Sequence, residues 1–286
     1  MAGDKRARTA DPAPAAPSAG ADSPYWVEAL SRGLDVLRAF DADHPSLSLA
    51  ELAQRLGWSR TTPYRFVWTL EHLGYLQRDA ESRRYRLGPR VLELGFAYLH
   101  SLPLVDLARP YLARLHQETG ASAHLGILDG KDVLYVALVA ARRISAITVN
   151  VGMRVPAHAG SIGKVLLAFS APEVVDALLA GGPLPAYTER TVTQPARLRQ
   201  YLARIREQGY VFNDQEFQLG VRSVAAPIFD AEGAVVAGIN AAAPIHELPD
   251  DVVETVVIPA VRRAAAELSA CLGHTGAPRA ARLAER

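Results

Sequence analysis

One glycine-flanked segment contains residue types that enzymes use for nucleophilic or phosphate-transfer chemistry. Residues 159–163 place Ser161 between small residues, as a nucleophile elbow does, but Ala159 stands where that motif requires its first glycine. Lys164 follows a glycine, as in a phosphate-binding loop, but His158 replaces the first glycine of that loop and Val165 replaces its Ser or Thr. Neither motif is complete, so a small-molecule hydrolase is the least favoured interpretation.

Two carboxylates form a second candidate site. Asp214 and Glu216 lie on one face of an expected extended segment, where they resemble a catalytic carboxylate pair. Ion pairs with Arg222 or with a dimer neighbour explain these residues as well as ligand contact does. The pair alone therefore does not indicate catalysis.

The histidine and cysteine content argues against a metal site. The eight histidines show no metal-ligand spacing, and the single Cys271 excludes an intramolecular disulfide and a Cys-based zinc site. Most of these histidines are expected at the surface or with satisfied hydrogen bonds. His124 on an expected strand and His158 in a loop are the exceptions. We expect no metal, no cofactor and no enzymatic activity.

Length and charge limit the remaining classes. The 286 residues suffice for one large or two modest domains, and 31 basic against 30 acidic residues give a net charge of +1. This balance excludes a histone-like protein, so affinity for nucleic acid requires a local patch. The longest charge-free stretches, of about 12 residues, are shorter than the ~20 that span a bilayer. We expect a soluble, cytoplasmic protein without membrane contact.

The N-terminal part of the chain predicts a winged helix-turn-helix. The expected elements are helices over residues 25–40, 48–56 and 59–73 and strands over residues 75–77 and 85–87. Ser48 and Glu51 have the spacing of a capping box. Either Ser59 or Thr62 begins the third helix, and Pro63 suits its first position only if Thr62 is the N-cap.

This region also holds the basic patch. Residues 58–90 contain seven arginines and three acidic residues, a local charge of +4. Four residues of the third helix are expected to face the core: Phe66, Val67, Leu70 and Leu73. The opposite face enters the major groove, where Arg65 can pair with a guanine, while arginines at the ribbon tip reach phosphate or the minor groove.

Eleven residues are candidate DNA contacts: Ser59, Arg60, Thr61, Thr62, Tyr64, Arg65, Trp68, Arg78, Arg83, Arg84 and Arg86. The alternative is a winged helix that binds protein, with Tyr64 and Trp68 partly buried. DNA binding is the better explanation of the charge.

Beyond residue 103 the pattern predicts an α+β domain with a largely antiparallel sheet. The expected strands cover residues 122–128, 133–139, 144–149, 209–212, 222–229 and 234–241, and the first two flank an Asp129-Gly130 hairpin signal. The expected helices cover residues 104–119, 161–169, 172–179, 195–208 and 249–272. The expected divisions are a disordered tail (1–24), the winged helix (25–88), a linker helix (89–102), a C-terminal domain (103–273) and a disordered tail (274–286).

Five segments together resemble the IclR family of bacterial transcription regulators. They are EALSRGLDVLRAF (28–40), LAELAQRLG (49–57), TPYRFVWTL (62–70), VGMRVPAHAGSIGKVLLA (151–168) and GYVFNDQEFQLGVRSVAAP (209–227). The resemblance covers both domains in order. Arg142-Arg143 and the segments 214–216 and 220–223 are most similar to the branch that regulates protocatechuate and hydroxybenzoate catabolism.

The resemblance implies a ligand-responsive repressor or activator of a catabolic operon, with a GAF/profilin-like effector domain. It further implies a homodimer or dimer of dimers on a palindromic operator, and a small organic acid as effector. The positions that it assigns to the effector site are His158, Gly160, Ser161, Asn213, Asp214, Glu216, Ser223, Asn240 and Ala242. A sensor or scaffold that does not bind DNA is the alternative.

Two positions depart from relatives that respond to glyoxylate or pyruvate. Asn213 stands where those relatives tend to carry an acidic residue, and Ala242 stands where they carry a serine. We therefore expect a different and bulkier ligand. His158 is expected to pair with a second acidic or phenolic group of that ligand, which suits an aromatic acid. Its carboxylate is expected at the free N–H groups of the helix that begins after Gly160, unless Ser161 caps that helix instead.

Overall fold

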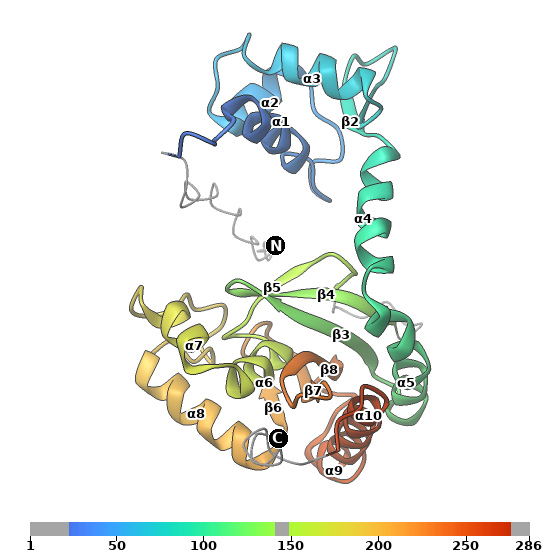
Figure 1. Ribbon diagram of the computed structural model, residues 1–286, viewed down its shortest axis with the longest axis vertical. Coiled ribbons are helices and arrows are strands. Elements are labelled where there is room, and N and C mark those ends of the chain that lie inside the picture. The colour runs from blue at the N-terminus through green and yellow to red at the C-terminus, as the bar shows by residue number, and fades with distance from the viewer. Residues whose placement is uncertain (1–22, 141–148, 276–286) are drawn as a thin grey trace, which may run out of the picture. The chain divides into compact units, whose positions relative to one another are not determined.

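The computed structural model describes residues 23–140 and 149–275. The chain divides into two compact units, one ending at Tyr98 and the other beginning at Leu99 (Figure 1). Most of the two expected tails, the Arg142-Arg143 pair and all but the last residue of the strand expected at 144–149 lie outside the described residues.

The N-terminal unit is a winged helix-turn-helix, as predicted. Its elements are α1 (Glu28–Arg38), α2 (Leu49–Leu56), α3 (Pro63–His72), β1 (Leu76–Arg78) and β2 (Tyr85–Leu87), and α4 (Arg90–His100) follows them. The two strands are antiparallel, and an isolated bridge joins Leu47 to Tyr85. Val36, Leu52 and Val67 from the three helices form a core that excludes water almost completely.

The ends of α2 and α3 follow from their sequences. At α2, Ser48 Oγ accepts from Glu51 N at 3.3 Å, and Glu51 Oε2 accepts from Ser48 N at 2.7 Å, which confirms the capping box. Thr62 is the N-cap of α3, with Pro63 at its first turn. The core position predicted for Leu73 is wrong: this residue is 47% exposed because the helix has already ended at His72.

The C-terminal unit has a six-stranded sheet in the order β5-β4-β3-β8-β7-β6, with antiparallel neighbours throughout. Its strands are β3 (Ser122–Asp129), β4 (Asp132–Val139), β5 (Arg154–Pro156), β6 (Val211–Asp214), β7 (Val221–Phe229) and β8 (Val235–Pro244). Its helices are α5 (Pro103–Thr119), α6 (Ser161–Phe169), α7 (Pro172–Leu179), α8 (Pro195–Gln208), α9 (Asp250–Val252), the π-helical turn η1 (Val253–Val257) and α10 (Ile258–Cys271). The predicted α+β class is confirmed.

Helices cover both faces of this sheet (Figure 1). Side chains of α5 and α10 form one core with alternate strand residues such as Leu125 and Ile239, while those of α6, α7 and α8 form a second core on the other face. Because neighbouring strand residues point to opposite faces, His124 and Asn240 lie on the α6 side. The sheet thus presents polar side chains beneath α6.

Glycines let the start of α6 approach its surroundings closely. A Cβ at position 163 would lie 2.2 Å from the carbonyl oxygen of Ala157, and one at position 238 would lie 2.9 Å from Ile162 Cγ2. These separations are too short for any side chain larger than hydrogen. The two glycines therefore hold the first turn of α6 against strand β8 and the preceding loop.

The prediction of a single helix over residues 249–272 is wrong in detail. The chain forms α9, the π-helical turn η1 and α10 there. Pro259 in the first turn of α10 has no N–H for a bond to the preceding turn, and its ring crowds that turn, which accounts for the interruption. Strand β5 was not predicted, because its three residues include a proline and show little alternation.

Within the described residues, no single helix is both long and apolar enough to cross a membrane; the bent pair α4 and α5 meets that condition only when the two are taken together.

Candidate functional sites

The outward face of α3 presents polar and aromatic groups. Tyr64 and Trp68 are 60% and 51% exposed, which does not favour the alternative in which they are packing residues. His72 stacks on the Trp68 ring with 3.7 Å between centroids. The Arg65 guanidinium lies 4.9 Å from the Phe66 ring centroid, and Arg65 itself is exposed. This face is accessible along its length.

The turn before α3 contributes further exposed groups. Ser59, Arg60 and Thr61 are exposed, while Thr62 is half-buried. Ser59 Oγ and Thr62 Oγ1 are 2.6 Å apart, so these hydroxyls bond to one another and neither caps the helix. The turn places the four residues next to the outward face of α3.

The wing arginines have different environments. Arg78, Arg83 and Arg86 are exposed, and Arg83 has a φ of 59°, in the left-handed region, at the turn between the strands. Arg78 lies over the Tyr85 ring, with 5.6 Å between the guanidinium carbon and the centroid. These three arginines can contact a ligand without breaking an ion pair with any described residue.

Arg84 is already engaged within the unit. It donates to Ser46 Oγ at 3.1 Å and to the Ser46 carbonyl oxygen at 2.9 Å, and it forms an ion pair with Glu51 at 2.9 Å. Hydrogen bonds from Ser48 and then the contacts with Arg84 lower the pKa of Glu51 to about 2. Arg84 therefore joins the wing to the cap of α2, and a DNA contact from it stays a prediction.

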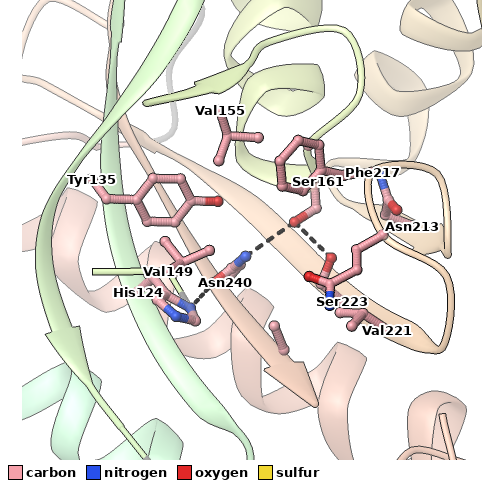
Figure 2. A pocket seen from close by; sticks show the side chains of 13 residues that line it. His124, Tyr135, Val149, Val155, Ser161, Asn213, Phe217, Val221, Ser223 and Asn240 are labelled. Carbon is pink, nitrogen blue, oxygen red and sulfur yellow. Dashed lines mark hydrogen bonds between the residues drawn. The ribbon is translucent and has the colours of Figure 1, made fainter. Parts of the chain in front are cut away.

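A pocket in the C-terminal unit lies between the start of α6 and the sheet (Figure 2). Six of the nine predicted effector positions line it: Gly160, Ser161, Asn213, Ser223, Asn240 and Ala242. The other lining residues are His124, Tyr135, Val149, Val155, Phe217, Gln218 and Val221. The lining thus combines small polar groups with apolar and aromatic surface, and none of the described residues that form it is a Lys, Arg, Asp or Glu.

Four of the lining side chains form one hydrogen-bonded chain (Figure 2). His124 Nδ1 lies 2.8 Å from Asn240 Oδ1, and Asn240 Nδ2 donates to Ser161 Oγ at 3.1 Å. Ser223 Oγ also donates to Ser161 Oγ, at 2.9 Å. The chain joins β3, β8, α6 and β7, so it places these polar groups relative to one another.

The first turn of α6 supplies further donors. Gly160 is its N-cap and has no side chain to cap it, so Ser161 is the first helical residue and not the cap. No described residue accepts a hydrogen bond from the N–H groups of Ser161, Ile162 or Gly163. Such N–H groups, together with the aligned dipoles of the helix, favour an anion.

Three predicted effector positions lie outside the pocket lining. His158 Nε2 bonds to the Pro185 carbonyl oxygen at 2.9 Å, and burial lowers the pKa of this histidine. Asp214 is next to Asn213 on β6 and so points to the opposite face, where it pairs with Arg190 and with Arg222. The ion-pair explanation that the sequence left open is the one observed for Asp214.

Glu216 also has a partner of its own. Its Oε1 lies 2.5 Å from Nζ of Lys164, whose side chain is fully buried. Burial lowers the pKa of Lys164 to about 8, against the effect of the nearby carboxylate. Asn213, although it lines the pocket, donates to the Ala159 carbonyl oxygen at 2.7 Å and accepts from Glu216 N at 3.2 Å. These residues tie the loop before α6 to the segment after β6.

His124 and Tyr135 are the lining residues of greatest chemical interest that the predicted site lacked. Burial lowers the pKa of His124 to about 4 and raises that of Tyr135. Their rings meet edge to face, with 5.5 Å between centroids. The period-two alternation of the 122–128 strand places His124 on one face, but only the pairing of His124 with Asn240 shows that this face lies under α6.

Within residues 23–140 and 149–275, no group of three His, Cys, Asp or Glu side chains is placed to hold a metal ion.

Comparisons with known proteins agree with this arrangement. The IclR helix-turn-helix domain matches residues 29–80, and the C-terminal domain of bacterial IclR transcriptional regulators matches residues 96–270. The chain is 35% identical over 246 residues to the Pca regulon regulatory protein of Pseudomonas putida, covering 86% of this chain and 84% of that protein. It is 33% identical over 227 residues to the transcriptional repressor IclR of Escherichia coli, covering 79% and 83%.

Solved structures give the same result. The IclR homologue of Microbacterium hydrocarbonoxydans complexed with 4-hydroxybenzoate has a TM-score of 0.75 at 29% identity, covering 85% of this chain and 98% of that chain. The Thermotoga maritima IclR structure has a TM-score of 0.71 at 26% identity, covering 86% of this chain and 98% of that one. The chain therefore belongs to the IclR family of bacterial transcriptional regulators, as a DNA-binding regulator with an effector domain and not as an enzyme.

Proposed function

We propose that this regulator represses or activates a catabolic operon in the bacterial cytoplasm in response to a small aromatic acid. The observation that carries the proposal is the pocket at the start of α6, which joins unpaired N–H donors to the apolar surface of Val149, Val155 and Phe217. A carboxylate suits the donors and a ring suits the apolar surface. The alternative, a sensor or scaffold that does not bind DNA, leaves the exposed arginines of α3 and the wing without a role.

The similarity to the Pca regulon regulatory protein and to a homologue complexed with 4-hydroxybenzoate supports the branch that regulates protocatechuate and hydroxybenzoate catabolism. Asn213 and Ala242 line the pocket and agree with this assignment. They stand where glyoxylate and pyruvate responders tend to carry an acidic residue and a serine, so the pocket has fewer small polar groups for a compact acid. The predicted pair Arg142-Arg143 lies outside the described residues.

For DNA, the proposal assigns sequence reading to α3 and positioning to the wing. Tyr64, Arg65 and Trp68 project from the accessible face of α3, so Arg65 is the residue that meets a base edge. Arg83 and Arg86, exposed on the wing, contact phosphate or the minor groove. The DNA backbone is contacted at the start of α3 by Ser59, Arg60, Thr61 and Thr62.

A second copy of this chain is the proposed partner for the exposed apolar residues of α1 and α4. Val27, the N-cap of α1, and Leu30 are 60% and 64% exposed, and Leu92 and Leu94 of α4 are both 59% exposed. Such surface is costly in water and is typical of association sites. A palindromic operator also requires a two-fold protein, which makes a homodimer or dimer of dimers the fitting assembly.

The DNA assignment predicts different effects for two arginines. Arg65→Ala should weaken binding to the operator by about 1–3 kcal/mol and reduce discrimination between operator and unrelated DNA. Arg83→Ala should weaken both DNAs alike and make binding less dependent on salt, since it removes a phosphate contact. Mobility-shift titrations with the intergenic DNA upstream of the protein's own gene, at several salt concentrations, measure both effects.

Arg84→Ala is an unsuitable partner for this comparison because it also removes the brace to Ser46 and Glu51. Arg86→Ala is the better second wing variant. If Arg65→Ala and Arg83→Ala reduce discrimination equally, the division between reading and positioning is wrong.

Self-association is tested by Leu30→Glu and Leu92→Glu. Each places a charge in the proposed apolar interface, so sedimentation at micromolar concentration should show a shift from dimer or tetramer towards monomer. Leu219→Glu, at a 59% exposed position of the other unit, is the matched control and should leave the mass unchanged. A wild-type monomer that still binds operator tightly would contradict the proposal.

The effector class is tested by calorimetric titration of the full chain with 4-hydroxybenzoate, protocatechuate and their neutral amides. The acids should bind at least about tenfold more tightly, because only a carboxylate gains from the charge at the start of α6. Ser161→Ala should weaken binding of the acids by removing one donor. Ser101→Ala, at an exposed position between α4 and α5 and outside the pocket lining, should not. Amides that bind as tightly as acids would place the anion site elsewhere.

A further inference from the structure

In the hydrogen-bonded network from His124 to Ser223, each contact has a defined donor and acceptor. Asn240 uses its Nδ2 to donate to Ser161, so its Oδ1 faces His124, and a carbonyl oxygen can only accept. The proton in the 2.8 Å contact therefore belongs to His124 Nδ1. Since burial keeps the imidazole neutral at pH 7, the other ring nitrogen, Nε2, carries a lone pair and no proton.

This lone pair has no donor among the residues that the structure describes. His124 is 2% exposed and lines the pocket, so the occupant of the pocket is the available source of a donor. A ligand that fills the pocket shuts water away from this acceptor, and an acceptor left without a partner is costly. A ligand that supplies the donor therefore has an advantage over one that does not.

The opposite end of the chain has the reverse character. Ser161 Oγ accepts from both Asn240 and Ser223, so its own proton is left to donate. This proton adds to the unpaired N–H groups of the first turn of α6. One side of the pocket is therefore rich in donors, while the side with His124 offers an acceptor.

The Asn240 amide separates these two sides, with hydrogen bonds of 2.8 and 3.1 Å at its ends. The ligand that fits has an acceptor group at one end and a donor at the other, not one compact polar head. Tyr135, whose ring packs edge to face on His124, has its hydroxyl directed towards the interior of the pocket (Figure 2). It is the second group able to meet the far end of a ligand.

We infer that His124 is a specificity-determining residue that accepts a hydrogen bond from a hydroxyl group of the effector and so selects hydroxylated aromatic acids over analogues without that hydroxyl. The inference rests on the proposed binding of an aromatic carboxylate at α6. It adds the second polar group of the ligand and the residue that recognises it.

The test compares 4-hydroxybenzoate with 4-methylbenzoate, whose methyl group has nearly the size of the hydroxyl but cannot donate. The wild-type full chain should bind the hydroxy acid about tenfold more tightly, as expected for one buried hydrogen bond that is otherwise unmade. In His124→Phe this ratio should fall to near one, with the loss confined mainly to the hydroxy acid. Tyr135→Phe removes the other polar group at that end of the pocket. Because the inference assigns the ligand hydroxyl to His124, this variant should keep most of the preference.

A preference that survives in His124→Phe, or that disappears in Tyr135→Phe instead, overturns the inference. Equal binding of the two acids by the wild type also overturns it, yet leaves the proposed function intact if acids still bind more tightly than amides. If neither acid binds, the proposed function and the inference fail together.

A second measurement needs no variant and remains decisive if His124→Phe does not fold. Nitrogen NMR of the wild-type chain labelled at histidine should show His124 as the Nδ1–H tautomer, with an Nε2 signal that shifts when 4-hydroxybenzoate binds and not when 4-methylbenzoate binds. A proton on Nε2 in the free protein would reverse the direction of the chain and overturn the inference.

Discussion

The pocket depends on the close approach of the first turn of α6 to the sheet. Gly163 packs on the Ala157 carbonyl oxygen and Gly238 lies under Ile162, at separations that admit no side chain. This approach brings Ser161 within hydrogen-bond distance of Ser223 and Asn240. It also leaves the N–H groups of the turn without partners among the described residues, so one packing constraint creates both the polar network and the proposed anion site.

A buried ion pair joins α6 to the segment that follows β6. Lys164, on α6, contacts Glu216, and Asn213 donates to the carbonyl oxygen of Ala159, which precedes the helix. An ion pair in such surroundings is costly to form and far more costly to break on one side only, so it favours a single position of the loop. The segment that carries Glu216 also carries Phe217, which lines the pocket. The pair thereby links the position of α6 to the shape of the ligand site without touching the ligand.

Much of the architecture could be predicted because it follows from local rules. Helical periodicity predicts α6, α7 and α8 with the bounds that the structure shows, α7 and α8 each begin at a proline, and the capping box predicts the start of α2. Strand alternation was informative as well, but it does not say which face meets which helix. The sequence therefore singles out His124 without placing it in the site. It assigns Asp214, one residue from Asn213, to the pocket, although the side chain of Asp214 points to the opposite face.

The remaining differences depend on contacts between distant residues. Nothing in the sequence near Arg84 indicates that Ser46 and Glu51 bind it, and nothing near His158 indicates its hydrogen bond to the Pro185 carbonyl oxygen.

The central claim is that a carboxylate occupies the start of α6 while His124 meets the far end of the same ligand. A crystal structure of the full chain with 4-hydroxybenzoate tests it most directly. The carboxylate oxygens should lie within hydrogen-bond distance of the N–H groups of Ser161–Gly163, with the phenol oxygen at His124 Nε2. A carboxylate bound away from α6, or the ligand in the reverse orientation, would contradict this claim.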